Sequence, residues 1–201
     1  MKILLYNDHF QNYKRYNIPK AQLVIADIPY NLGANAYASN PEWYIDGDNK
    51  NGESKKAGKS FFSTDNNFNI AEYFHFCNRL LKKEPMKGEK GAPCMIVFCA
   101  FQQIPKVITE AEKYGFKNYI PLTFCKNYSP QVLKANMKIV GATEYALVLY
   151  RGKLPKFNNV GEDSKSHMIF NWFDWKRDGK DYPQIHPSQK PVSVLKRLIE
   201  I

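Results

Sequence analysis

The sequence predicts an α/β fold, in which helices pack on the faces of a largely parallel β-sheet. A continuous apolar run at residues 94–100 is typical of a strand buried on both faces of a parallel sheet. Strand-like and helix-like segments alternate along the chain, which favours right-handed β-α-β crossovers. The length of 201 residues is enough for one domain with its own core.

Five segments have the composition of strands. The second of them is continuously apolar and runs directly into Asp27. The last alternates in side-chain type, as a strand with two different faces does. In chain order, the expected strands are residues 2–6, 22–26, 94–100, 117–125 and 144–150.

Three further segments are expected to form helices. Residues 70–83 carry apolar side chains at helical spacing, so one face can pack on the sheet. Residues 104–114 are followed by Gly115, which suits a left-handed C-cap. Residues 192–201 follow Pro191, which is compatible with the first turn of a helix.

Two long spans, residues 31–69 and 151–185, have neither strand nor helix periodicity and are rich in Gly, Asn and Asp. The first has a basic centre, and we expect it to be a mobile loop. Loops of this length in compact domains are usually functional or disordered.

The chain is basic, with 29 Lys and Arg residues against 19 Asp and Glu and a net charge of +10. This surplus favours a polyanionic partner, DNA or RNA, and a generic solvated basic surface is the alternative. Aromatic residues make up 14% of the chain, and beside cations they can stack on unpaired bases, although they also fill cores.

The four cysteines, Cys77, Cys94, Cys99 and Cys125, form no C-x-x-C pair, and three lie in apolar segments. We therefore expect buried free thiols, with no zinc site, no other metal and no disulfide. No apolar run reaches the roughly eighteen residues of a membrane span. The apolar stretch near the N-terminus is too short for a secretory signal, so we expect a cytoplasmic protein.

The segment with the clearest chemistry is Asp27-Ile28-Pro29-Tyr30, directly after the buried strand at 22–26. Ligands of open α/β sheets bind at the carboxyl ends of strands. A carboxylate there can accept hydrogen bonds from an amino group, and an aromatic ring can stack on a planar base. The proline restricts the turn, so that a main-chain carbonyl can point at the same amino group. A plain strand-end turn is the alternative.

Several segments together resemble the DNA amino-methyltransferases, which modify adenine N6 or cytosine N4. Residues 26–33, Ala-Asp-Ile-Pro-Tyr-Asn-Leu-Gly, resemble the catalytic Asp/Asn/Ser-Pro-Pro-Tyr/Phe motif of that family. Residues 186–191, His-Pro-Ser-Gln-Lys-Pro, are similar to its His-Pro-Thr-Gln-Lys-Pro motif. Residues 77–82, 124–127 and 143–149 resemble the elements between the two motifs. The motif order resembles the β group, which implies a circularly permuted, Rossmann-like methyltransferase fold.

The resemblance implies a catalytic role for each residue of the first motif. Asp27 would accept a hydrogen bond from the exocyclic amine of a flipped base, and the Ile28 carbonyl would accept a second one. Pro29 would fix the turn, and Tyr30 would stack on the base. Positioning would then be the main catalytic device.

The same resemblance implies S-adenosylmethionine as the methyl donor. Ser188, Gln189 and Lys190 would lie near its methionine end, and Asp8, after the first expected strand, would contact its adenosine. A strand-end turn is the alternative for Asp8. The full set of implied donor-site residues is Asp8, Asp27, His186, Ser188, Gln189 and Lys190.

Two features depart from the family pattern. The second motif position is Ile28 in place of proline, which leaves the required carbonyl in place and makes the turn less rigid. No Phe-x-Gly-x-Gly segment, which wraps the donor in the β group, occurs in these 201 residues. The strands between the first one and that of Asp27 are missing too, so we expect an incomplete sheet and donor site.

We divide the chain into a catalytic core at residues 1–150, a target-recognition insertion at 151–185, and the donor-site motif with the start of a helix at 186–201. The expected partner is double-stranded DNA. The candidate DNA-binding residues are Lys55, Lys56, Lys126, Trp172, Trp175, Lys176 and Arg177. A flap packed on the sheet is the alternative for the tryptophans.

Three functions stay open beside adenine N6 methylation. One is cytosine N4 methylation, since Asp27 is typical of adenine enzymes without being exclusive to them. Another is DNA binding by a truncated, non-catalytic relative. The third is methylation of RNA or of protein amides, although amide-modifying relatives typically carry Asn at that position. A homodimer, a cognate restriction endonuclease, and a bacterial or phage origin are also open.

Overall fold

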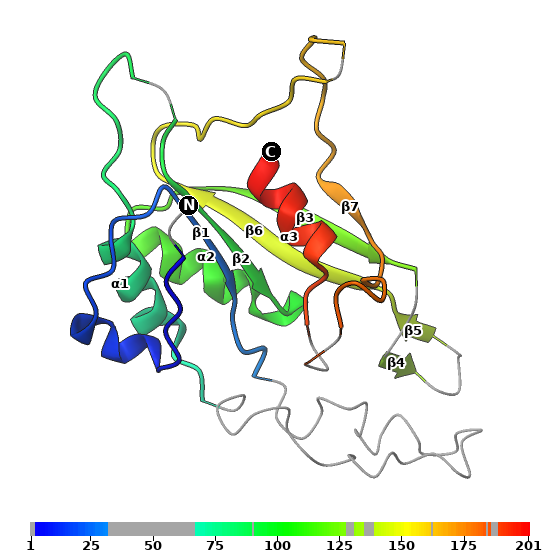
Figure 1. The fold of residues 1–201 in the computed structure, drawn as a ribbon. Helices are drawn as coiled ribbons and strands as arrows, with labels where there is room; N and C mark the ends of the chain where they lie inside the picture. Colours follow the sequence, from blue (N-terminus) through cyan, green and yellow to red (C-terminus); the bar gives the residue numbers. More distant parts are fainter. Residues whose placement is uncertain are drawn as a thin grey trace.

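The computed structural model describes residues 3–31, 67–89, 91–127, 131–134, 139–161, 163–183, 185 and 189–201 (Figure 1). Three α-helices and seven strands lie in these ranges. The helices are α1 (Ile70–Leu80), α2 (Ile104–Lys113) and α3 (Val192–Glu200), with short 3₁₀ helices η1 (Phe10–Arg15) and η4 (Phe101–Gln103). The strands are β1 (Leu23–Asp27), β2 (Cys94–Cys99), β3 (Asn118–Lys126), β4 (Gln131–Lys134), β5 (Ile139–Gly141), β6 (Thr143–Tyr150) and β7 (Trp172–Trp175).

Five of these strands form one sheet in the order β1-β2-β6-β3-β7, and β4 pairs only with β5. The pairs β1–β2 and β3–β7 are parallel, whereas β6 runs antiparallel to both β2 and β3. The carboxyl ends of β1, β2, β3 and β7 therefore meet the amino end of β6 at one edge of the sheet. We call this the carboxyl edge.

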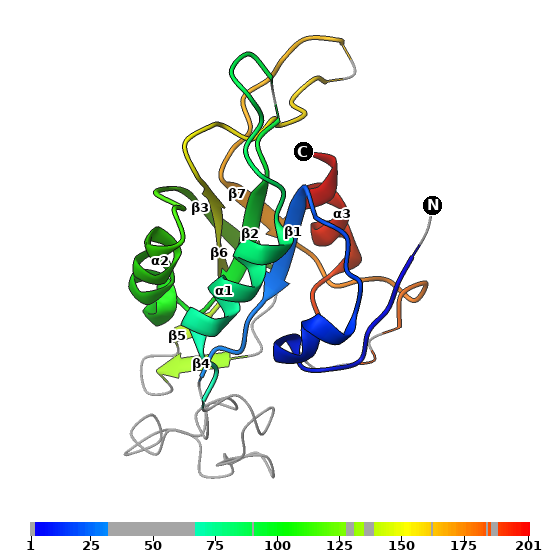
Figure 2. The same ribbon diagram turned by 90° about the vertical axis from the view of Figure 1, so that its left-hand side faces the viewer.

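The sheet is covered on both faces, and β2 shows this most directly. All six of its residues are buried. Successive side chains of a strand point to opposite faces. Accordingly Met95 and Val97 pack with α1 and α2, whereas Ile96 and Phe98 pack with α3. The helices α1 and α2 lie on one side of the sheet and α3 lies on the other (Figure 2). The continuous apolar run in the sequence follows from this arrangement.

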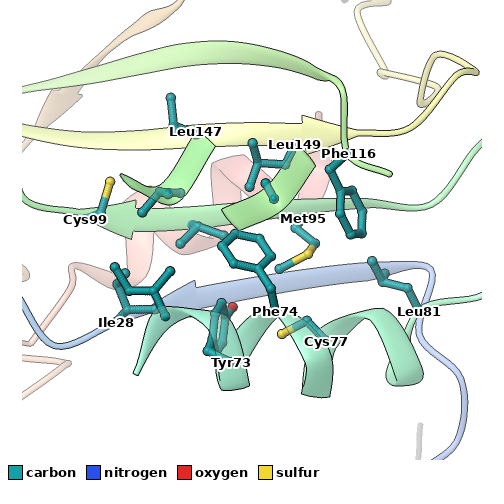
Figure 3. Packing of buried hydrophobic residues seen from close by; sticks show 14 residues of the cluster. Ile28, Tyr73, Phe74, Cys77, Leu81, Met95, Cys99, Phe116, Leu147 and Leu149 are labelled. Atoms are coloured by element: carbon teal, nitrogen blue, oxygen red, sulfur yellow. The ribbon is translucent and has the colours of Figure 1, made fainter. Parts of the chain in front are cut away.

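Phe74 lies at the centre of the packing under α1. Its fully buried ring points from the helix into a cluster with Met95, Phe116 and Leu149 (Figure 3). Asn69 caps the helix, because its side chain accepts hydrogen bonds from the first-turn amides of Ala71 and Glu72. Capping and the apolar face together fix α1 against β1 and β2.

The end of α2 confirms the expected role of Gly115. This glycine has a φ of 86°, in the left-handed region. Its amide donates to the Glu112 carbonyl and the next amide, of Phe116, donates to the Ala111 carbonyl. This turn buries Phe116 beneath the sheet.

The structure corrects three of the secondary-structure predictions. Residues 3–6 form no strand, and the side chains of Ile3 and Leu5 are 68% and 90% exposed. A strand needs a hydrogen-bonding neighbour, and no described strand lies beside this segment. The sheet is mixed, because β6 is antiparallel. Residues 151–185, expected to lack regular structure, contribute β7 to the same sheet as the core.

The cysteines are free, as expected, although only three of them are buried. Cys77, Cys94 and Cys99 are buried, and burial raises the pKa of the Cys77 and Cys99 thiols to about 12. Cys125 is exposed, and its side chain points to the face of β3 opposite the buried Leu122 and Phe124. No helix in the described ranges is both long and apolar enough to cross a bilayer.

Replacing Phe74 by Ala tests this packing. A ring that is 0% exposed leaves a cavity when it is removed, so we expect the free energy of unfolding to fall by about 3–5 kcal/mol. Urea unfolding measures this change. Phe170→Ala removes the same ring from a side chain that is 69% exposed, and it should change stability little. Equal losses in the two variants would contradict the assigned core.

Candidate functional site

The Asp27–Tyr30 segment lies at the carboxyl edge, as predicted. Asp27 is the last residue of β1 and pairs in register with Phe98 of β2. The Ile28 amide continues this parallel ladder by donating to the Phe98 carbonyl at 3.3 Å. Ile28 is buried, whereas the Asp27 carboxylate is 40% exposed. The buried side chain anchors the turn and leaves the carboxylate accessible.

Gln103, in η4, contacts the same turn from the neighbouring strand. Its Nε2 donates to the Pro29 carbonyl at 2.9 Å, and its Oε1 accepts from the Ala100 amide at 3.0 Å. One buried amide therefore joins the chain after β1 to the chain after β2.

Two ion pairs flank Tyr30. The Lys190 ammonium donates to Oδ2 of Asp27 at 2.8 Å, and the Lys126 ammonium donates to Oε1 of Glu144 at 2.6 Å. The Tyr30 hydroxyl joins the pairs, because it donates to Oε2 of Glu144 at 2.6 Å and lies 3.5 Å from Nζ of Lys190. We call these five residues the charged network.

Three of the charged side chains of this network are largely buried, so their charges are little screened by water and interact strongly with one another. Side-chain exposure is 9% for Lys190, 10% for Lys126 and 16% for Glu144. Burial acts to raise the pKa of Glu144, yet the charges of Lys190 and Lys126 and the hydrogen bonds from Lys126 and Tyr30 outweigh it, so this pKa is lowered. Burial, followed by the charges of Glu144 and Asp27, raises the pKa of Tyr30 well above its ordinary value. Tyr30 therefore stays a neutral hydrogen-bond donor to an ionised Glu144.

Trp175 and Phe98 form an aromatic wall beside the two lysines. The Lys126 ammonium lies 5.3 Å from the centroid of the Trp175 ring. The Lys190 ammonium lies 5.7 Å from that ring and 5.4 Å from that of Phe98. The two rings pack edge to face. Cation–π attraction of this kind is strongest where water is excluded, so the wall helps to hold both cations.

The chain leaves the site through Asn31, which has a φ of 53°. Its side chain accepts from the Phe68 amide at 3.1 Å and donates to the Phe68 carbonyl at 3.4 Å. The two ends of the long span predicted as a loop are thus joined beside Tyr30. Most of that span, including Lys55 and Lys56, lies outside the described residues.

The structure brings only part of the predicted donor set together. Lys190 meets Asp27, and Gln189 accepts a hydrogen bond from the Ile185 amide. Asp8 is exposed, and both its oxygens accept hydrogen bonds from its own neighbourhood: the His9 amide, the Asn12 side chain and the Tyr16 hydroxyl. None of these partners belongs to the charged network. His186 and Ser188 lie outside the described residues.

Some of the predicted DNA-binding residues are exposed, and others are buried or held in an ion pair. Trp172, Lys176 and Arg177 are exposed. Trp175 is only 3% exposed and belongs to the core, so in this structure it is unavailable for direct contact with a ligand as large as DNA. Lys126 is held by Glu144. Arg177 and Gln189 line one cavity of about 260 Å³ at the start of α3.

Sequence reasoning missed Gln103 and Glu144. Glu144 was noted only as the start of a strand, and its one distinguishing signal was a charged residue at the end of an apolar run. Gln103 carried no signal beyond its position after the buried strand. Among the residues that the structure describes, no group of His, Cys, Asp and Glu side chains could hold a metal ion.

The charged network makes stability depend on pH. Because the pKa of Glu144 in the folded protein lies below its ordinary value of 4.5, ionised Glu144 stabilises the fold above that value. This contribution is lost as the pH falls through the folded-state pKa. We expect the difference in unfolding free energy between the wild type and Glu144→Gln to shrink over this acidic range, as measured by urea unfolding. Glu112→Gln, an exposed change in α2, should show no such trend. A pH-independent difference for Glu144→Gln would contradict the assigned network.

Comparison with solved structures identifies the fold. The crystal structure of M1.HpyAVI in complex with SAM matches with a TM-score of 0.57 and 18% identity, over 96% of this chain and 71% of that one. The crystal structure of M1.HpyAVI matches with a TM-score of 0.53 and 16% identity, over 96% and 69%. This confirms the predicted Rossmann-like α/β fold.

Comparison with known sequences identifies the family. No curated protein matches the chain significantly. The family model for N6/N4 DNA methylases, however, matches residues 21–201, which include the Asp27–Tyr30 turn, the charged network and α3. A match over this much of the chain shows that the protein belongs to the N6/N4 family of DNA methylases.

Proposed function

We propose that this chain is an S-adenosylmethionine-dependent DNA methyltransferase that methylates the exocyclic amine of a flipped base, adenine N6. The observation that carries the proposal is the set of groups at the end of β1. The Asp27 carboxylate and the Ile28 carbonyl lie in the same turn as a half-buried aromatic residue, Tyr30. Within the described part of the chain, no group donates a hydrogen bond to the Ile28 carbonyl. Two acceptors beside a ring suit a planar base that carries an amino group.

The charges of the site suit the methyl donor that was bound to M1.HpyAVI. S-adenosylmethionine carries a sulfonium and an ammonium cation together with a carboxylate. Asp27 presents an accessible carboxylate at the carboxyl edge, and Lys190 presents an ammonium beside it. We therefore propose Asp27, Gln189 and Lys190 as donor-site residues, with His186, Ser188 and Asp8 as further candidates. When bound, the donor supplies an electrophilic methyl group.

The protein's part in the reaction is to orient the target amine. A base must leave the duplex to reach a site of this kind. Once it stacks on Tyr30, its two N–H bonds can donate to Asp27 and to the Ile28 carbonyl, which directs the nitrogen lone pair away from both acceptors. The nitrogen–carbon bond forms as the sulfur–carbon bond breaks, and the electron pair stays on sulfur. The nitrogen then loses a proton, for which the Asp27 carboxylate is the adjacent acceptor.

Lys190 occupies the place that the target amine would take. Its ammonium donates to Asp27 at 2.8 Å, as a target amine would. An entering amine must displace it, and the Tyr30 oxygen, 3.5 Å from Nζ, is a second acceptor within reach of the displaced ammonium. The pair thus keeps the Asp27 carboxylate compensated until a base arrives.

DNA contact is proposed for the exposed residues of the predicted set, namely Trp172, Lys176 and Arg177. We add Lys55 and Lys56 on their charge alone. Phosphate contacts by these cations would make binding weaken steeply with salt. Lys126 and Trp175 are assigned a different role, because they are buried and hold Glu144 and Lys190.

Asp27→Ala tests the catalytic assignment. Loss of a hydrogen bond to a charged acceptor costs about 1.5–3 kcal/mol, so kcat/KM should fall about 10- to 150-fold. Methylation is measured as transfer of tritiated methyl to DNA, with mapping of the modified base. Asp181→Ala removes an exposed carboxylate and should leave the rate unchanged.

The mapped product also separates the candidate functions. N6-methyladenine supports the proposal, whereas N4-methylcytosine alone would replace adenine by cytosine as the target. DNA binding by wild-type protein without any methylation would favour the non-catalytic relative.

Two substitutions of Tyr30 distinguish the contribution of its ring, which would stack on the base, from that of its hydroxyl, which donates a hydrogen bond. Base–aromatic stacking is worth about 1–3 kcal/mol, so Tyr30→Ala should lower affinity for the flipped base by about 5- to 150-fold. Tyr30→Phe keeps the ring and loses only the hydroxyl that donates to Glu144, and we expect a much smaller loss. The fluorescence of 2-aminopurine at the target position reports the stacked base. Equal quenching with Ala and Phe would argue against stacking on Tyr30.

A further inference from the structure

The backbone ladder between β1 and β2 ends one bond earlier than its register allows. In a parallel ladder, a residue donates to one carbonyl of the neighbouring strand and accepts from the amide two residues further on. Ile28 donates to the Phe98 carbonyl, so its own carbonyl should accept from the Ala100 amide. The Ala100 amide instead donates to the side chain of Gln103 at 3.0 Å.

Gln103 is held in the one orientation that allows this. Its Oε1 accepts from an amide and its Nε2 donates to the Pro29 carbonyl, so exchanging the two atoms would break both bonds. The residue is 9% exposed and belongs to the short helix that follows β2. Its amide therefore has a fixed direction and cannot turn to water.

We propose that Gln103 is a positioning residue that keeps the Ile28 carbonyl free for the target amine. By accepting the Ala100 N–H, it removes the donor that would otherwise occupy that carbonyl. By holding the Pro29 carbonyl, it turns the next peptide plane away from the base. The inference rests on the proposed function, because it assigns the freed carbonyl to an exocyclic amine.

A helix cap alone does not explain this arrangement. A cap needs only the bond from the Ala100 amide, which is local. The second bond reaches Pro29, 74 residues away in the sequence and on a different strand. Gln103 thus binds both the catalytic turn, through the Pro29 carbonyl, and the start of its own helix, through the Ala100 amide.

The consequence is a carbonyl that selects for an amino group. A base with an exocyclic amine can donate to the Ile28 carbonyl, whereas a base without one leaves it unpaired in a largely buried turn. An unpaired buried acceptor is unfavourable, so the carbonyl contributes to discrimination between such bases.

The first experiment tests the diverted bond and does not depend on catalysis. Scalar couplings across hydrogen bonds, between the Ala100 amide nitrogen and the carbon of the accepting C=O group, show which carbonyl oxygen accepts the Ala100 N–H. In the wild type we expect a coupling to Cδ of Gln103, and in Gln103→Met a coupling to the Ile28 carbonyl carbon. Gln103→Glu keeps an acceptor oxygen and should retain the diverted bond, as should Gln102→Met at the exposed neighbour. A wild-type coupling to Ile28, or none to Ile28 in Gln103→Met, would overturn the proposal.

The second experiment tests what the free carbonyl does. Duplexes carrying adenine or purine at the mapped target position differ only in the exocyclic amine, and fluorescence anisotropy measures their affinities. We expect the wild type to prefer adenine, and Gln103→Met to reduce this preference about 3- to 10-fold, as the loss of one hydrogen bond does. Gln102→Met should retain the preference.

The two experiments separate the possible failures. If Gln103→Met weakens adenine and purine duplexes equally, Gln103 is only a structural residue and the proposal is wrong. If the wild type neither methylates DNA nor prefers adenine, the proposed function fails, and with it the role of the carbonyl, even where the diverted bond is observed.

Discussion

The buried Glu144 carboxylate is the group on which the arrangement of the site depends. Moving a carboxylate out of water is costly unless cations and hydrogen-bond donors replace the water. Lys126 and Tyr30 supply those donors at 2.6 Å each, one to each oxygen. The Tyr30 ring is therefore fixed by a charge and by packing together. Removing Glu144 would leave the largely buried Lys126 ammonium without its carboxylate and the Tyr30 hydroxyl without its acceptor. The positions of Lys126 and Tyr30 therefore both depend on Glu144.

The mixed sheet explains how one carboxylate can reach these partners. Because β6 runs antiparallel, its amino end lies at the same edge as the carboxyl ends of β2 and β3. Glu144, near the start of β6, lies opposite Phe124 in the register, two residues from Lys126. A parallel β6 would place this end of the strand at the opposite edge. The antiparallel direction, which corrected the expected sheet, is thus what completes the site.

Sequence reasoning could predict the parts of the site that form short contiguous patterns. Asp27–Tyr30 follows an apolar strand directly, and Lys190 lies in a six-residue motif, so both were found. Glu144 was missed because it meets Tyr30 across 114 positions, through strand pairings that no local pattern specifies. β7 was missed because its four residues at the sheet edge carry two exposed side chains and no apolar run. Residues 2–6 had strand composition, but among the described residues no strand edge lies beside residues 3–6. Composition alone does not show whether a strand has a partner.

The charged network also constrains how a base can enter. Asp27 and Glu144 are neutralised by Lys190 and Lys126, and the Tyr30 hydroxyl lies between the two pairs. If a neutral amine takes the place of Lys190 at Asp27, the Lys190 ammonium loses the Asp27 carboxylate as its partner. The charge of Lys190 helps to lower the pKa of Glu144, so the displaced ammonium already interacts favourably with that second carboxylate. The displaced cation therefore stays compensated within the site. The amine donates to Asp27 without neutralising its charge, so a cationic methyl donor beside Asp27 would supply the compensation that Lys190 gave. On the proposed function, the charges at the carboxyl edge would therefore favour the binding of base and donor together over that of the base alone.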